Sequence, residues 1–268
     1  MSWGLSHPAW LLLIVVKTSM PARSQAPVVL VTGGAVRIGA AIVRYFHGKG
    51  WDVIIHCRNS REEALALAGE LNTLRPGSTH LVQAALEDVA ELEQMCVSIA
   101  DRPGRLNALI NCASDFSTDE VLTRDTRLDK LIGANVMAPH ALSLKLSPLL
   151  LRSGGGIVNI LDNRMVNHNT LPGRDAYYAS KAALASITLS LAHRLAPKIR
   201  VNAVAPGIVL PLAGTDWTPH QRRGEINKIL LRRIPDPSDI AEAVFFMATA
   251  RHITGQTVCV DGGESLMW

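Results

Sequence analysis

The sequence has little cysteine, few charged residues and no long apolar run, and each shortage excludes a class of protein. Its four cysteines, at positions 57, 96, 112 and 259, include no C-x-x-C pair and no histidine at zinc-finger spacing, which excludes a disulfide-stapled domain and a zinc finger. Charged residues make up 19% of the chain and hydrophobic residues 48%, a balance that excludes an intrinsically disordered protein. We expect a packed globular chain with reduced thiols in the cytoplasm and no metal.

The basic residues are scattered rather than gathered in a run. The chain has 27 Lys and Arg against 23 Asp and Glu, which gives a formal net charge of +4. We therefore expect no nucleic-acid partner and only a mild preference for anionic ligands.

The apolar run near the N-terminus is too short to cross a membrane. Residues 10–16 read WLLLIVV, against the roughly 20 residues that a spanning helix needs. No Lys or Arg precedes this run and no small-x-small site follows it, which disfavours a secretory signal. We expect residues 1–26 to be an N-terminal extension, which is either disordered or the product of a start placed upstream of Met20. Residues 27–268 then form a single domain.

Short β-branched runs alternate with longer helical stretches from residue 27 onward. The expected strands are 28–31, 51–57, 80–86, 106–111, 156–161, 200–206 and 257–260, and the expected helices are 38–49, 61–74, 87–100, 125–151 and 177–196, with one more helix after a loop beyond residue 206. Strands separated by helices rather than hairpins predict a parallel sheet covered on both faces. The predicted fold class is α/β, a doubly wound seven-stranded parallel sheet of the Rossmann type, with ligands beyond the carboxyl ends of the strands.

The turn after the first strand has the composition of a dinucleotide site. TGGAVRIG at residues 32–39 lies between a strand and a helix, where glycines let the backbone approach a pyrophosphate at the helix N-terminus. The second strand ends in HCRNS at residues 56–60, with no carboxylate before Glu62. An NAD site usually places an acid there, whereas Arg58 and Arg37 can bind the 2′-phosphate of NADPH. The sequence therefore favours NADPH.

Tyr177 and Lys181 are four residues apart on an expected helix and share one of its faces. A phenol has an ordinary pKa of about 10, and a neighbouring ammonium favours the phenolate, so we expect the pair to be tuned toward neutral pH. Tyr178 lies about 100° further round the helix, so we do not expect it to be the catalytic tyrosine.

From about residue 28 to residue 263 the chain resembles the short-chain dehydrogenase/reductase family. The resemblance rests on TGGAVRIG, on NCAS at 111–114, on Asn135, on Y-x-x-x-K at 177–181, on PG at 206–207 and on DGG at 261–263. It implies a hydride transfer in which Tyr177 donates a proton, Lys181 lowers the pKa of Tyr177 and holds the nicotinamide ribose, and Asn135 supports a proton-relay water. It also implies a homotetramer.

Two departures from the common family pattern resemble its pteridine reductase branch, which includes bacterial dihydromonapterin reductases. Asp162 stands where most members have Ser, and Arg37 where most have Gly. A pterin needs an aromatic stacking partner and a polar edge, which Phe116 and Ser114 can provide. Tyr177 and Asp162 would then deliver the proton that the reduction requires.

These arguments predict a set of site residues. The expected catalytic residues are Asp162, Tyr177, Lys181 and Asn135. The expected cofactor contacts are Gly33, Arg37, Ile38, Gly39, His56, Arg58, Asn59, Ser60, Leu86, Asn111, Ala113, Ser114, Tyr177, Lys181, Pro206 and Gly207. The expected substrate contacts are Arg37, Ser114, Phe116, Asp162 and Tyr177, with Met165, His168, Leu210, Pro211 and Trp217 as further pocket walls and residues 266–268 of a neighbouring subunit nearby.

The sequence allows alternatives for the position of Asp162, for the adenine contact and for the substrate. The loop between Asp162 and Tyr177 is about two residues longer than the family's, so Asp162 can be displaced or can simply cap a loop. Ala85 stands where relatives usually have Asp for the adenine, a contact that the backbone of Leu86 can replace. The hypothesis is an NADPH-dependent reductase of a pterin or folate. The alternatives are a reductase of a carbonyl such as a 3-oxoacyl thioester, and a non-catalytic NADP-binding sensor.

Overall fold

The protein is described by a computed structural model that covers residues 26–120, 128–166, 170–211 and 214–267. Apart from Ala26, the expected N-terminal extension lies outside these ranges. Within them, strands form one parallel sheet in the order β3-β2-β1-β4-β5-β6-β7. The strands are β1 (Val28–Val31), β2 (Asp52–Cys57), β3 (Thr79–Gln83), β4 (Ala108–Asn111), β5 (Gly156–Ile160), β6 (Arg200–Pro206) and β7 (Thr257–Val260). The order reverses between β1 and β4, which confirms the predicted doubly wound α/β architecture.

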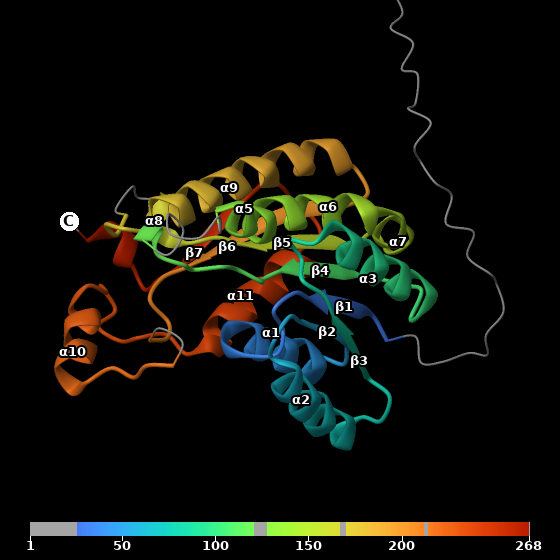
Figure 1. Ribbon diagram of the computed structural model, residues 1–268, viewed down its shortest axis with the longest axis horizontal. Coiled ribbons are helices and arrows are strands. Elements are labelled where there is room, and N and C mark those ends of the chain that lie inside the picture. The colour runs from blue at the N-terminus through green and yellow to red at the C-terminus, as the bar shows by residue number, and fades with distance from the viewer. Residues whose placement is uncertain (1–25, 121–127, 167–169, 212–213, 268) are drawn as a thin grey trace, which may run out of the picture.

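Helices cover both faces of the sheet (Figure 1). On one face lie α1 (Arg37–Gly48), α2 (Arg61–Leu74) and α11 (Pro237–Thr249), and on the other lie α3 (Val89–Asp101), α6 (Ala138–Lys145) and α9 (Asp175–Leu195). Alternate residues of β1 point to opposite faces: Val29 and Val31 pack in the first core, and Val28 and Leu30 in the second. Because both faces of the sheet are buried, the strands are apolar throughout rather than alternating.

The long helical tract expected at 125–151 is interrupted. Residues 125–127 lie outside the described ranges, and the remainder divides into α5 (Leu128–Ile132), the π-helical η1 (Gly133–Met137), α6 and α7 (Ser147–Ser153). Prolines at the starts of α6 and α7 cause the breaks, since Pro139 and Pro148 have no N–H for the bond to the carbonyl four residues before. In η1 the Ala138 N–H instead bonds Gly133 O, five residues back.

The region after β6 also differs from expectation. One helix was predicted there, but the structure has α10 (Pro219–Asn227) as well as α11, each beginning with a capping box followed by proline. Two further short elements, α8 (Asn163–Val166) and η2 (Glu264–Leu266), lie near the carboxyl ends of β5 and β7. In the described ranges, no helix is both long and apolar enough to cross a membrane.

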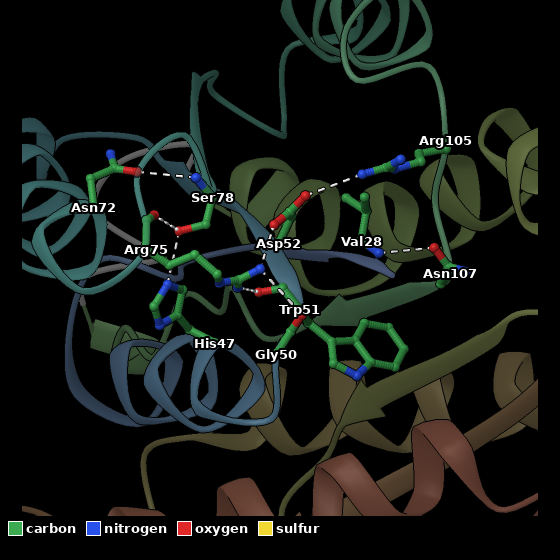
Figure 2. A network of polar contacts seen from close by, with 10 residues as sticks. All are labelled: Val28, His47, Gly50, Trp51, Asp52, Asn72, Arg75, Ser78, Arg105 and Asn107. Atoms are coloured by element: carbon green, nitrogen blue, oxygen red, sulfur yellow. Dashed lines mark hydrogen bonds and ion pairs between the residues drawn. The ribbon is translucent and has the colours of Figure 1, made fainter. Parts of the chain in front are cut away.

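A polar network holds the amino end of the sheet (Figure 2). Asp52, at the start of β2, accepts hydrogen bonds from Arg75 at 2.8 Å and from Arg105 at 3.1 Å. At the start of β1 the Val28 N–H donates to Asn107 Oδ1 at 2.8 Å. These contacts fix the strand starts at the end of the sheet opposite the predicted site.

Candidate active site

Two adjoining cavities open at the carboxyl ends of the strands. One, of about 230 Å³, is lined by residues that follow β2 and β3, including Arg58, Asn59, Ser60 and Leu86. The other, of about 700 Å³, is lined by Arg37, Ile38, Gly39, Ser114, Phe116, Asp162, Tyr177, Lys181, Pro206 and Gly207, among others. Gly33 and Ala113 border both cavities. The fold therefore brings most of the predicted site residues to one crevice.

The Tyr177 hydroxyl donates a hydrogen bond to Asp162 Oδ2 at 3.0 Å. Asp162 follows β5, and its Oδ1 accepts from the Arg164 N–H at 2.9 Å. Tyr177 lies on α9, whose first turn is held by Asp119, which accepts from the N–H groups of Asp175 and Ala176 at 2.8 and 3.2 Å. The lengthened loop between Asp162 and Tyr177 therefore does not displace the carboxylate from the phenol.

In the cofactor-free protein the surroundings of Tyr177 shift its pKa in the direction opposite to the one expected from Lys181 alone. Burial, and the charge and hydrogen bond of Asp162, raise the pKa of Tyr177 well above its ordinary value. Lys181 lies with Nζ 5.6 Å from the centroid of the Tyr177 ring, and it donates to Ile160 O at 2.9 Å. Burial lowers the pKa of Lys181 to about 8. In the cofactor-free protein Tyr177 therefore keeps its proton.

Asn135 lies in the π-helical turn η1 and is completely buried. Its Oδ1 accepts from the Asp115 N–H at 2.7 Å, and its Nδ2 donates to Asp115 O and to Ser180 Oγ at 2.9 and 3.1 Å. Both hydrogens of the amide are thus used. Pro139, four residues further on, has no N–H to donate to the Asn135 main-chain carbonyl.

His56 positions the glycine turn. Its Nδ1 accepts from the Gly33 N–H at 3.0 Å, which leaves Nε2 as the donor to Ala84 O at 3.0 Å. Burial lowers the pKa of His56 to about 4, so the ring is neutral at pH 7. The side chain predicted to touch the cofactor borders the smaller cavity and also orders the glycine turn beside it.

The glycine turn is packed closely against itself and against the residues after β4. A Cβ placed on Gly39 would lie 2.1 Å from Gly33 O, so no side chain can replace it. Gly33 has a φ of 62°, which glycine adopts without strain, but Arg37 has a φ of 55°, which is unfavourable for any other residue. Arg37 Nη2 donates to Pro211 O at 2.7 Å. A strained arginine at this turn is typical of a functional position.

Asn111 and Arg58 have partners that the sequence did not predict. Asn111 is buried and its Nδ2 donates to Asn159 Oδ1 at 2.8 Å, so the side chain is directed along the sheet rather than into the crevice. Arg58, expected to face a 2′-phosphate, donates from Nη1 to Glu87 Oε1 at 2.9 Å.

Phe116 is partly covered by an arginine that sequence reasoning missed. Phe116 is 37% exposed and meets Tyr177 edge to face, with ring centroids 4.5 Å apart and planes at 85°. The Arg174 guanidinium lies 3.7 Å from the centroid of the Phe116 ring and donates to the Phe116 carbonyl oxygen. The sequence signal that could have indicated this contact is the position of Arg174, a cation three residues before Tyr177.

The remaining predicted pocket walls have different positions. Leu210 and Pro211 border the 700 Å³ cavity, as predicted, and together with Trp217 they line a further cavity of about 430 Å³ beside Tyr177. Met165 packs against the core around Leu161 and Leu184. His168 and Trp268 lie outside the described residues.

Comparison with known proteins identifies the family. A family model described as enoyl-(acyl carrier protein) reductase matches residues 34–265, which is most of the chain. The chain belongs to the short-chain dehydrogenase/reductase family. It is thus a member of an oxidoreductase family whose proteins use nicotinamide cofactors.

Individual relatives of this short-chain dehydrogenase/reductase fall into two functional groups. Pteridine reductase 1 of Leishmania tarentolae is 32% identical over 92% of this chain and 99% of its own length. Dihydromonapterin reductase of Klebsiella pneumoniae is 28% identical over 91% of this chain and 99% of its own. The 3-oxoacyl-[acyl-carrier-protein] reductase of Rickettsia felis is 34% identical over 87% of this chain and 95% of its own. Overall identity therefore does not separate a pterin from a 3-oxoacyl substrate.

Proposed function

We propose that the protein is an NADPH-dependent reductase of pterins, which converts an oxidised pterin or a dihydropterin to the tetrahydro form. The observation that carries this proposal is the hydrogen bond from the Tyr177 hydroxyl to Asp162 Oδ2 at 3.0 Å. It lies in a cavity that is also lined by Phe116 and Arg37. This combination offers a proton-donating pair, an aromatic ring and a cation to a flat nitrogen heterocycle.

The residues after β2 favour NADPH over NADH. Arg58, Asn59 and Ser60 line the smaller cavity and present a cation, an amide and a hydroxyl where an NAD site usually places an acid. The turn at Gly33 and Gly39 would receive the pyrophosphate, and Lys181 would hold the nicotinamide ribose. When bound, NADPH supplies a hydride to the carbon of the reduced C=N bond.

The chain's own residues would donate the proton that the reduction requires. Tyr177 and Asp162 hold one proton between their oxygens, and this proton goes to the ring nitrogen of the reduced bond. The Lys181 ammonium stabilises the phenolate that remains. The main-chain carbonyl of Asn135 would hold the water through which Tyr177 is reprotonated.

A second candidate function is reduction of a 3-oxoacyl thioester, which the family model and the relative from Rickettsia felis favour. Asp162 argues against it. The oxygen of a reacting carbonyl gains negative charge, and a carboxylate in place of a hydroxyl donor would repel that charge.

We further propose a cytoplasmic homotetramer. The four cysteines are free thiols, which fits a reducing compartment. Leu266, near the C-terminus, is 65% exposed and available to approach a neighbouring subunit. Light scattering that gives the mass of a monomer would overturn the tetramer.

The direct test is a comparison of substrates. Purified enzyme is mixed with NADPH and either 7,8-dihydrobiopterin, dihydromonapterin or acetoacetyl thioester, and the loss of nicotinamide absorbance is followed. We expect turnover with a pterin that is abolished in Tyr177→Phe while NADPH binding is kept. Turnover of the thioester alone would establish the second candidate, and turnover of none of them would remove the pterin proposal.

A further inference from the structure

A buried carboxylate near the C-terminus joins segments that border the predicted site. Glu264, the first residue of η2, is only 7% exposed. Its Oε1 accepts a hydrogen bond from Arg164 Nη2 at 2.8 Å. Its Oε2 accepts from Asn163 Nδ2 at 3.1 Å and from the Ile208 N–H at 3.0 Å. Because Asn163 and Arg164 begin α8 and Ile208 follows β6, Glu264 ties the segments after β5 and β6 to η2.

The surroundings of this carboxylate leave it no other position. A Cβ placed on Gly207 would lie 2.6 Å from Glu264 Oε2, so the chain after β6 packs directly on the carboxylate. Asn163 is buried, and its Nδ2 also donates to Asp261 Oδ2 at 3.2 Å. The side chain of Arg164 is only 11% exposed, so the ion pair with Glu264 is shielded from water. These contacts fix the orientation of both side chains of the pair.

The same arginine orients the carboxylate of the proton-donating pair. The Arg164 N–H donates to Asp162 Oδ1 at 2.9 Å, while the Tyr177 hydroxyl donates to Asp162 Oδ2 at 3.0 Å. Helix α8 is a single turn of four residues, too short to be stable without tertiary contacts. The position of its Arg164 peptide group therefore depends on anchors such as the ion pair with Glu264.

We propose that Glu264 is a positioning residue that, through Arg164, holds the Asp162 carboxylate at hydrogen-bond distance from the Tyr177 hydroxyl. This inference rests on the proposed function, in which that pair donates the proton. The described lining of the cavity beside Tyr177 includes Arg164 and Ile208 but not Glu264, so Glu264 acts through its neighbours. Apolar side chains of the same size often stabilise a fold as well as a buried ion pair does, so the benefit of this pair is its fixed geometry.

Ionisation of Tyr177 reports whether this geometry is kept. The groups of Arg174, Lys181 and Tyr178 also face the phenol. A carbonyl oxygen after β4 holds the first, a carbonyl oxygen of β5 holds the second, and α9 carries the third. In the described ranges none of the three donates to η2. Asp162 raises the pKa of Tyr177 by its charge and its hydrogen bond, so displacement of this carboxylate should lower that pKa.

The test follows Tyr177 without cofactor or substrate. Ultraviolet difference titrations, each corrected with the same protein carrying Tyr177→Phe, give the lowest pH at which its tyrosinate forms, and circular dichroism marks unfolding. Glu264→Ala removes the acceptor oxygens, and Glu264→Gln keeps one of them without the charge. Asp52→Asn is the matched control, because it weakens the buried ion pairs with Arg75 and Arg105 at the opposite end of the sheet.

We expect the tyrosinate of Tyr177 to form at a pH lower by about one unit or more in Glu264→Ala, the effect that a nearby charge typically has on a pKa. Glu264→Gln should give a smaller change in the same direction. Asp52→Asn should be less stable than the wild type but should titrate like it. In an Asp162→Ser background the Glu264 substitutions should cause no further change, because they act through the same contact.

Three results would overturn the inference. The first is a folded Glu264 variant in which Tyr177 ionises as in the wild type or, like it, stays protonated until the protein unfolds. The second is an equal change in Asp52→Asn, and the third is a change that persists undiminished in the Asp162→Ser background. Glu264→Gln serves alone if Glu264→Ala does not fold. Failure of this test leaves pterin reduction standing, and absence of pterin turnover leaves the titration unaffected.

Discussion

The Gly33 N–H donates a hydrogen bond to His56 Nδ1 at 3.0 Å, and this bond joins the glycine turn to the end of β2. The same ring donates through Nε2 to Ala84 O, beyond β3. One neutral imidazole thus holds three strand ends in place, and protonation of the ring would remove the acceptor that Gly33 needs.

The first prediction concerns stability in mild acid. The pKa of His56 is lowered from 6.5 to about 4 in the folded state, so below pH 6.5 the unfolded state binds a proton that the folded state does not. The free energy of unfolding should fall as the pH drops from about 6.5 to 4, by up to about 3 kcal/mol from this group. Urea titrations of wild type and His56→Gln measure it, and the exposed His252→Gln is the control. Equal slopes in all three proteins would contradict the prediction.

The second prediction concerns Asp162 and the pKa of Tyr177. Asp162→Ser removes a negative charge and a hydrogen-bond acceptor that raise this pKa, so tyrosinate should form at lower pH. Pterin reduction should fall by about 100-fold, because proton transfer by a positioned side chain typically contributes that much or more. Ultraviolet difference titration against Tyr177→Phe and steady-state kinetics provide the two readouts. An unchanged titration would show that the two side chains are not coupled in solution.

The third prediction is an alkaline limit on activity. The pKa of Lys181 is lowered by burial to about 8, so the ammonium that stabilises the phenolate is present below pH 8 and lost above it. The value of kcat/KM, which reports groups of the free enzyme, should therefore decline as the pH rises through about 8. Residual activity of Lys181→Met should show no such decline. A wild-type profile that stays flat to pH 10 would contradict this assignment.

The fourth prediction separates strain from function at Arg37. Its φ of 55° disfavours every residue except glycine, so Arg37→Gly should be about 1 kcal/mol more stable than Arg37→Ala, the reverse of the usual order in helices. Both variants lose the hydrogen bond to Pro211, so this loss cancels between them. Both should bind NADPH more weakly than the wild type. Denaturant titration and fluorescence titration measure the two effects, and an alanine variant at least as stable as the glycine variant would refute the strain argument.

Much of the fold could be predicted because buried parallel strands and intervening helices have different lengths and periods in the sequence. The interruption at η1 was missed because APHALSLKL remains a good helical pattern, and only the missing N–H of Pro139 disturbs its bonding. Strand β3 ends at Gln83 rather than at residue 86, because Ala84 and Leu86 are buried as loop residues and are apolar for that reason.

The site was predictable as a set of residues but not as a set of contacts. Tyr177, Asp162 and Phe116 meet in one cavity as expected, because each follows a strand end or begins a crossover helix. The Arg174 guanidinium on Phe116 and the Glu87 partner of Arg58 depend on how separate loops fold against one another. No local pattern in the sequence records such distances.

The two members of the proton-donating pair are each anchored at their own end of the segment that joins them. Asp162 is placed by β5 and by its own turn, and the first turn of α9 is capped by Asp119, which begins a helical turn after β4. Side chains at residues 170–173, between these anchors, can accordingly be exchanged while the carboxylate and the phenol keep their positions. A protein engineer who wishes to broaden or narrow the range of accepted molecules should begin by diversifying that stretch.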